Sequence, residues 1–186
     1  MTVTEPRRAD ARRNRERVIT AAAEVFAEQG IEAGIPEVAE RAGVGKGTVY
    51  RNFETKEDLV AAVQVERIRA WRKRLCEEAE TGDPWSVLTA YLFRAATRLA
   101  TDRSTDLSAG RVSTNPALLK ERAELNREID SLLDLAKAQG KVRSDVTSAD
   151  IRVLFGGISR ILNDDGVKDP ETWRRYAGMV VDSLRA

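Results

Sequence analysis

Histidine is absent from this chain of 186 residues, and cysteine occurs once, at Cys76. These two shortages remove the usual ligands of zinc and iron, so we expect neither a metal site nor a cofactor. One thiol cannot form an internal disulfide, which is typical of proteins from a reducing compartment. Acid–base catalysis would fall to carboxylates, lysine or tyrosine, and no nucleophile-elbow serine or phosphate-binding glycine loop is present. The sequence thus predicts a protein that is not an enzyme.

Long apolar runs are also missing. No stretch of 18 consecutive apolar residues is available to span a membrane. The N-terminal segment is too basic and too polar for a secretory signal. We therefore expect a cytoplasmic protein that makes no membrane contact.

Glycine and proline are scarce, with 12 and 5 occurrences, while hydrophobic residues make up 42% and charged residues 33% of the chain. This composition favours an all-α globular protein, and apolar residues recur at helical spacing throughout. Thr55, Ser148 and Asp169 are expected to cap helices. The pattern predicts about nine helices, over residues 14–30, 36–42, 45–52, 56–80, 84–101, a short turn within 102–115, 116–140, 148–163 and 170–185.

The most informative segment is residues 41–53, where two short amphipathic helices flank Gly43. A helix-turn-helix needs a tight turn at that point and a residue that tolerates positive φ, as glycine does. Apolar residues, among them Val49 and Phe53, face one side. The other face of the second helix carries cations and hydrogen-bond donors at nearly every position, over a length that fits the major groove. The segment predicts a DNA reader.

Individual residues of the second helix suggest different contacts with DNA. Arg51 suits bidentate recognition of guanine, and its alternative is a salt bridge with Glu54 or Glu57. Lys46 is expected at a base edge or a phosphate, with a solvated lysine as the alternative. Thr48 is suited to bonding a phosphate or packing its methyl group on thymine, and otherwise to capping the helix.

The remaining outward positions of this helix are expected to hold it against the DNA. Gly47 has no side chain, which allows the helix to approach the groove floor closely. Tyr50 is expected to donate its hydroxyl to a phosphate, with packing against the core as the alternative. Asn52 and Lys56 are expected to position the DNA backbone rather than to read bases.

The N-terminal segment is strongly basic, with six arginines and two acidic residues between positions 7 and 17. Residues 1–13 are expected to form a flexible arm. Arg12 and Arg13, together with Arg7 and Arg8, are candidates for tracking phosphates or entering the minor groove. A disordered tail that adds only non-specific affinity fits the same residues.

Four spaced groups of residues carry a resemblance that covers about residues 14–60. They are Val18, Ile19, Ala21, Ala22, Phe26 and Gly30; Val38, Ala39, Ala42, Gly43 and Val44; residues 47–53; and Lys56, Glu57 and Leu59. In this combined spacing the chain resembles the tetracycline-repressor (TetR) family of bacterial transcription regulators. Residues 173–186 look more loosely like one branch of the same family.

The resemblance implies two domains and a mechanism. Residues 14–58 would form the DNA-binding domain, with the helix-turn-helix at about 33–52, and residues 59–186 a larger domain for effector binding and dimerisation. The protein would be a homodimeric repressor, paired through about 148–185, that a small-molecule effector releases from a palindromic operator on double-stranded DNA. A regulator without an effector, and a helical small-molecule-binding protein or enzyme, are the alternatives.

The last two predicted helices carry the apolar stripes that such a dimer would use. These stripes fit an intrachain core as well as an interface between subunits. Their residues are Ile151, Leu154, Phe155, Ile158 and Leu162, followed by Trp173, Tyr176 and Val180.

One position departs from the family pattern. Family members commonly carry threonine or serine at the start of the second helix, where this chain has Gly34. The backbone N–H groups there still favour an anion such as a phosphate. The full set predicted to contact DNA is Gly34, Gly45, Lys46, Gly47, Thr48, Tyr50, Arg51, Asn52 and Lys56, with arm contacts from Arg12 and Arg13.

No motif identifies the effector. The second domain offers one set of residues suited to lining an apolar cavity, and the same set describes an ordinary helical core. The predicted lining is Trp85, Leu88, Leu92, Phe93, Leu107, Asn126, Leu132 and Phe155.

Overall fold

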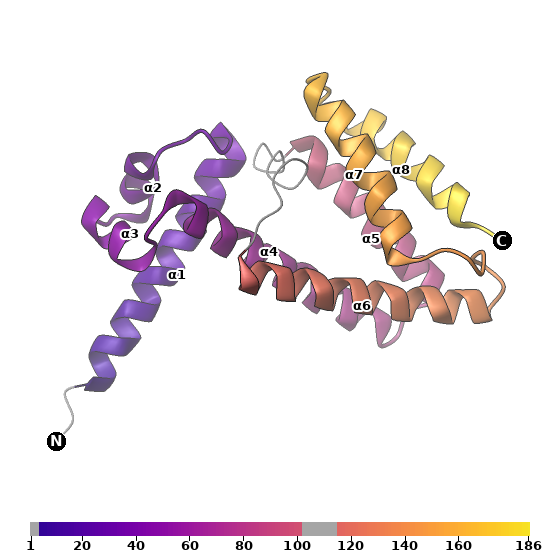
Figure 1. Cartoon of the computed structure of the whole chain (residues 1–186), viewed down its shortest axis with the longest axis horizontal. Helices are drawn as coiled ribbons and strands as arrows, with labels where there is room; N and C mark the ends of the chain where they lie inside the picture. Colours follow the sequence, from indigo (N-terminus) through magenta and orange to yellow (C-terminus); the bar gives the residue numbers. More distant parts are fainter. Residues whose placement is uncertain (1–3, 102–114) are drawn as a thin grey trace.

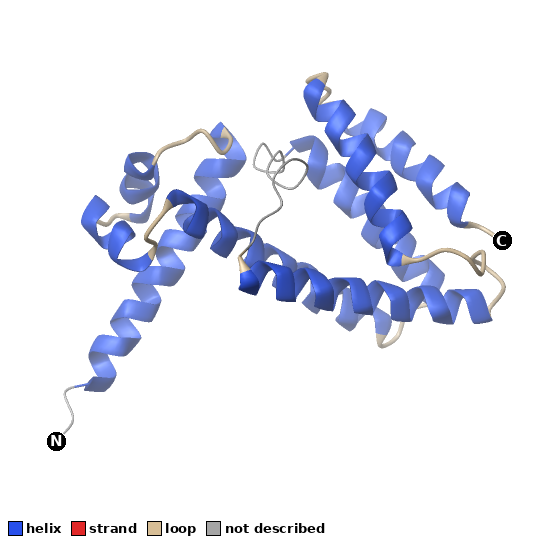
Figure 2. Cartoon of the chain, viewed as in Figure 1, coloured by secondary structure: helices blue, strands red, loops and turns tan. Residues whose placement is uncertain are grey.

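The computed structural model describes residues 4–101 and 115–186, and these residues form eight α-helices and no strand (Figures 1 and 2). This confirms the all-α fold. The ninth predicted helix, a short turn within 102–115, lies outside the described residues. The helices are α1 (Thr4–Gln29), α2 (Ile35–Ala42), α3 (Lys46–Asn52), α4 (Lys56–Ala79), α5 (Pro84–Thr101), α6 (Pro116–Ala138), α7 (Ser148–Asp164) and α8 (Pro170–Leu184).

Helix α1 begins at Thr4, about ten residues before the predicted start. The segment predicted as a flexible arm is therefore largely helical and projects beyond the rest of the N-terminal half (Figure 1). Its opposite charges lie three or four residues apart, a spacing that supports a helix. Arg12 lies 3.7 Å from Glu16, and Arg13 pairs with Asp10. A net count of charges does not reveal this pairing, which depends on the spacing of the charged residues along the helix.

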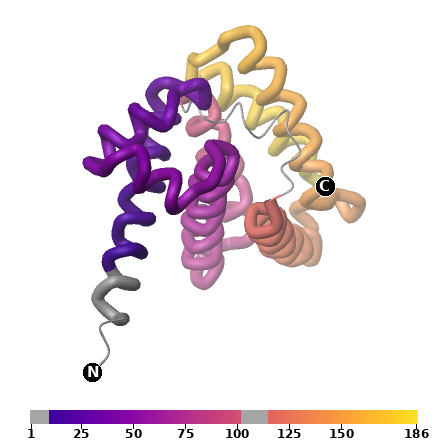
Figure 3. Tube along the Cα trace, turned by 60° about the vertical axis from the view of Figure 1, so that its left-hand side comes forward, coloured from indigo at the N-terminus to yellow at the C-terminus, as the bar shows by residue number. Residues whose placement is uncertain are grey.

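Three hydrophobic cores are buried in the described residues, and α4 takes part in two of them. Buried residues of α1, α2 and α3 form the first core together with Leu59, Val60 and Val63 of α4. Further along α4, Leu75 joins the second core, built with α5, α6, α7 and α8. The first core thus extends five residues beyond the boundary predicted at Asp58. Figure 3 shows α4 between the N-terminal helices on one side and α6 on the other.

The C-terminal half is a bundle in which α5 packs against α8 and α6, and α4 packs against α6. Trp173 of α8 is among its largest fully buried side chains. Its indole Nε1 donates a hydrogen bond to the carbonyl oxygen of Val167 at 2.9 Å, so its polar atom is satisfied. Within the described ranges, none of the helices combines the length and hydrophobicity needed to cross a bilayer.

The structure confirms two of the three predicted helix caps. Thr55 and Asp58 form a reciprocal capping box, and Asp169 accepts hydrogen bonds from the first turn of α8. The third prediction is wrong, because Thr147 caps α7. Ser148 is the first residue of that helix, and its hydroxyl donates to Asp130 of α6 at 2.8 Å.

Ion pairs join α4 to α6 along their contact. Glu121 of α6 is only 6% exposed, and its carboxylate accepts hydrogen bonds from Arg69 Nε at 2.8 Å and Arg72 Nη1 at 2.7 Å. Arg72 also pairs with Glu124 and Glu128. A buried carboxylate that accepts charged donors from both arginines fixes the position of α4 on α6.

Replacing Glu121 with glutamine should lower the free energy of unfolding by about 1–3 kcal/mol at neutral pH, because two guanidinium groups lose a charged acceptor. The hydrogen bond from Arg69 lowers the pKa of Glu121 below 4.5. The stabilisation is therefore complete above that value and disappears as the pH falls through the lower pKa of the folded state. Urea denaturation of parent and variant should show a constant difference at about pH 7 and 5, and a smaller one at about pH 3.5.

Glu77→Gln is the matched control. Its carboxylate is 62% exposed and lies 3.8 Å from Lys73, and its replacement should change the stability by less than about 0.5 kcal/mol. Equal effects of the two substitutions would contradict a special role for Glu121.

Candidate nucleic-acid interface

The turn between α2 and α3 has the geometry that the sequence predicts. Gly43 adopts φ 64° and ψ 39°, the left-handed conformation in which other residues are strained. Its N–H donates to the Glu40 carbonyl oxygen and the N–H of Val44 donates to that of Ala39, both at 3.0 Å. This pair of hydrogen bonds is a Schellman motif, which ends α2 and redirects the chain into α3.

Two arginines attach α2 to α1. Arg17 Nη2 donates to the carbonyl oxygen of Ala42 at 2.6 Å, so a side chain of α1 satisfies the last turn of α2. Arg41 pairs with Glu28 at 2.8 Å and with Glu24 at 3.3 Å, and these hydrogen bonds raise its pKa. Together with the shared core, they hold the helix-turn-helix on α1.

Helix α3 presents one face to the core and the other to solvent. Val49 is fully buried, and at 100° per residue Gly47 and Arg51 lie opposite it, one turn apart. Lys46 and Arg51 are exposed, and Tyr50 is 53% exposed. Within the described chain, Arg51 forms no ion pair with either of its neighbouring glutamates. The outward face is therefore cationic and free of intrachain contacts at its centre.

The other predicted contact residues occupy less open positions. Thr48 is half-buried and does not cap α3, since Gly45 is the N-cap residue. Asn52 Nδ2 donates to the Thr48 carbonyl oxygen at 2.8 Å, so this side chain lies on its own helix. Lys56 is half-buried at the start of α4.

The glycines around the turn differ in what surrounds them. A Cβ at Gly45 or Gly47 would meet no other atom within 4 Å, so the fold does not require glycine at either position. Gly34 caps α2 without a side-chain hydrogen bond, and a Cβ there would lie 2.8 Å from Glu37 Oε2. The Glu37 carboxylate therefore places negative charge at the helix start that was predicted to meet a phosphate.

Most of the predicted effector residues that the structure describes belong to the second core or pack against it. Trp85, Leu88, Leu92 and Leu132 are buried in the second core, while Phe93, Asn126 and Phe155 are half-buried. Leu107 lies outside the described residues. One cleft, lined by α1, α4, α5 and α8, includes Phe93 and no other described residue of this set. Apolar periodicity identified core positions here because a core and a ligand cavity use the same residue types.

The comparisons with known proteins agree with this geometry. Residues 18–63 match the family model "Bacterial regulatory proteins, tetR family", and residues 83–186 match "Transcriptional regulator SbtR-like, C-terminal domain". The chain belongs to the TetR family. It is thus a transcription regulator with a DNA-binding helix-turn-helix, and the outward face of α3 is the part of that motif directed away from the core.

Relatives of this TetR-family chain cover nearly its whole length. The repressor BepR of Brucella suis is 28% identical over 86% of this chain and 70% of its own length. A TetR regulator from Mycobacterium vanbaalenii is 31% identical, with a TM-score of 0.63 over 96% of this chain and 99% of that one. A structure solved for the control of antibiotic production by bacterial hormones is 26% identical, with a TM-score of 0.72 over 94% and 98% of the two chains.

Several other curated regulators match over 53 to 60 residues only. They are 42% identical to this chain there, and the alignment spans 28 to 45% of their own length.

Changing Gly47 to alanine separates the fold from DNA binding. The new methyl group would meet open space and raise helix propensity, so the melting temperature should stay equal or increase. Affinity for a duplex enriched from random sequence should fall about tenfold or more, because the methyl group stands at the centre of the exposed face. Thermal melting and fluorescence anisotropy measure the two effects. Unchanged affinity would mean that this face does not contact DNA.

Proposed function

We propose that the chain is a homodimeric transcriptional repressor that a small-molecule effector releases from a palindromic operator. The observation that carries the proposal is the outward face of α3, where Arg51 and Lys46 are exposed beside a glycine with open space around it. The repressor BepR supports negative control, and the structure solved for the control of antibiotic production by bacterial hormones supports a small-molecule signal.

In this proposal the residues of α3 divide into readers and supports. Arg51, at the centre of the exposed face, reads a guanine through its two parallel donors. Lys46 contacts a base edge or a phosphate at the start of the helix, and Tyr50 donates its hydroxyl to a phosphate. Asn52 keeps its side chain on the helix and contributes to register rather than to base recognition. Two such helices, about 34–36 Å apart in a dimer, would bind adjacent major grooves.

In vitro selection of random duplexes at near-physiological salt should enrich an inverted repeat, since salt suppresses non-specific binding. Arg51→Ala should lose about 1–3 kcal/mol of discrimination at one base pair of each half-site. Arg127→Ala is the matched control, because this arginine of α6 is 74% exposed and lies far along the chain from α3. Enrichment of no sequence, or equal losses in the two variants, would refute the assignment.

The proposed dimer surface lies on α7 and α8. The predicted stripes turned inward in part, since Ile151, Leu162, Trp173 and Val180 are buried within the chain. Leu154 of the predicted stripe, together with apolar residues outside that stripe, leaves an apolar face open to solvent, with glycines between these residues. The exposed apolar residues are Val153, Leu154, Ile161 and Met179, and the glycines are Gly156, Gly157 and Gly178.

This face suits a second copy of the same surface. Val153 is 65% exposed and Ile161 is 62% exposed. Val153, Gly157 and Ile161 are spaced four residues apart, so they lie one above the other on the same face of α7. Large apolar residues at such exposure gain free energy when a partner covers them. Glycines between them allow the partner helix to approach closely.

Ile161→Asp should convert the dimer to a monomer, because it would place a charge in an apolar interface. Leu135→Asp is the control, since Leu135 is 54% exposed on α6, outside the proposed interface. Light scattering coupled to size-exclusion chromatography measures the mass of each variant. A parent protein that is monomeric at micromolar concentration, or a dimer that survives Ile161→Asp, would contradict the proposed interface.

A further inference from the structure

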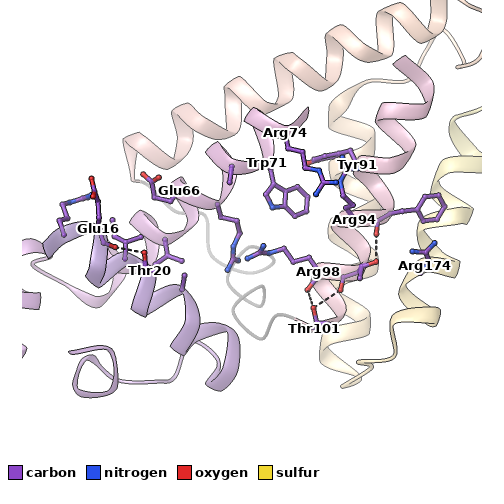
Figure 4. A pocket seen from close by; sticks show the side chains of 18 of the residues that line it. Glu16, Thr20, Glu66, Trp71, Arg74, Tyr91, Arg94, Arg98, Thr101 and Arg174 are labelled. Carbon is purple, nitrogen blue, oxygen red and sulfur yellow. Dashed lines mark hydrogen bonds between the residues drawn. The ribbon is translucent and has the colours of Figure 1, made fainter. Parts of the chain in front are cut away.

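A wide cleft separates the DNA-binding half from the C-terminal bundle. It has a volume of about 1120 Å³ and is lined by α1 on one side and by α4, α5 and α8 on the others. Figure 4 shows Glu16 and Thr20 of α1 across the cleft from Trp71, Tyr91 and Arg174. The volume exceeds the usual range of small-ligand sites, which leaves room for a ligand of considerable size.

The walls of the cleft carry a strong excess of positive charge. Among the described residues of the lining, two glutamates, Glu16 and Glu66, accompany seven arginines. A concave surface with one dominant sign of charge concentrates ligands of the opposite sign. The arginines are Arg12, Arg15, Arg67, Arg74, Arg94, Arg98 and Arg174.

These arginines are not equivalent. Arg74 and Arg94 share the carboxylate of Glu78, at 2.8 Å and 2.6 Å, so both have a charged partner. The guanidinium of Arg174 instead stacks over the ring of Phe93, 5.5 Å from its centre, and forms no ion pair within the described chain. Stacking uses the face of a guanidinium and leaves the N–H donors at its edge available for an anion.

Aromatic side chains supply the apolar part of the same cleft. Trp71 and Tyr91 meet edge to face, with ring centres 5.4 Å apart, and Phe93 lies beside Arg174. The Tyr91 hydroxyl has no hydrogen-bond partner in the described chain. Burial raises the pKa of Tyr91, so it stays a neutral donor at physiological pH. An unpaired donor next to a ring pair can bind a polar atom on an aromatic ligand.

We propose that this cleft binds an organic anion, with an aromatic or extended apolar body against Trp71, Tyr91 and Phe93 and its acidic group on Arg174. The regulatory part of this inference rests on the function proposed above. Ile19 and Thr20 of α1 line the opposite wall. A ligand held on α4, α5 and α8 that also reaches this wall would favour one spacing of the DNA-binding half and the bundle. Binding would shift the population away from the arrangement that fits the operator.

Two dyes with the same ring system test the ligand class on the protein without DNA. 1-Anilinonaphthalene-8-sulfonate carries a sulfonate, and N-phenyl-1-naphthylamine lacks it. Fluorescence titration should give an affinity about tenfold or more higher for the anionic dye. Arg174→Gln should weaken the anionic dye at least about fivefold, as expected for loss of a charge-assisted hydrogen bond, and leave the neutral dye unchanged. Trp71→Ala should weaken both dyes.

Arg175→Gln is the matched control, because Arg175 is the next residue of α8 and does not line the cleft. Circular dichroism melts confirm that each variant is folded. Equal binding of the two dyes, or equal effects of the Arg174 and Arg175 substitutions, would overturn the proposal.

The regulatory step is measured separately, by adding the anionic dye to the complex with a selected duplex. If the dye releases DNA from the parent protein, and releases less from Arg174→Gln, the regulatory step is supported. If the dye leaves DNA binding unchanged, the regulatory step is refuted. Failure of the duplex selection would refute the proposed repressor, whereas the dye titrations report on the cleft alone.

Discussion

Helix α4 is packed into two hydrophobic cores at once, and this constraint relates the DNA-binding half to the rest of the molecule. Its first turns carry Leu59 and Val63 into the core under the helix-turn-helix, and Leu75 lies in the core of the bundle. Between them, Arg69 and Arg72 attach the helix to the buried Glu121. Because packed cores resist continuous deformation, a shift of α4 in the bundle moves the DNA-binding half as a unit.

The sequence was sufficient to predict the parts of the fold that depend on local chemistry. Gly43, flanked by short apolar helices, specified the turn, and the pair Thr55 and Asp58 specified the start of α4. The start of α7 was mispredicted because two residues competed for one role. Thr147 and Ser148 are both good caps, and contact with Asp130 of α6, which no local pattern reveals, places Ser148 inside the helix.

The surfaces that carry function were harder to predict, because they depend on which side of a helix another helix covers. The outward face of α3 was accessible to sequence reasoning, since one buried residue, Val49, determines the whole face. The exposed stripe of α7 was not, since both sides of that helix carry apolar residues. The cleft was missed for a further reason. Its arginines come from four helices, so they converge only in three dimensions.

The interhelical contacts of this protein are maintained by arginine and carboxylate groups whose ionisation lies far from neutrality. Hydrogen bonds to glutamates raise the pKa of Arg41 and Arg72. In the same way, hydrogen bonds from arginines lower the pKa of three glutamates, Glu28, Glu78 and Glu121. With no histidine in the chain, the side chains that most often act as proton sensors are absent. The charges at these contacts therefore stay constant around neutral pH, so the packing of these helices does not depend on proton binding there.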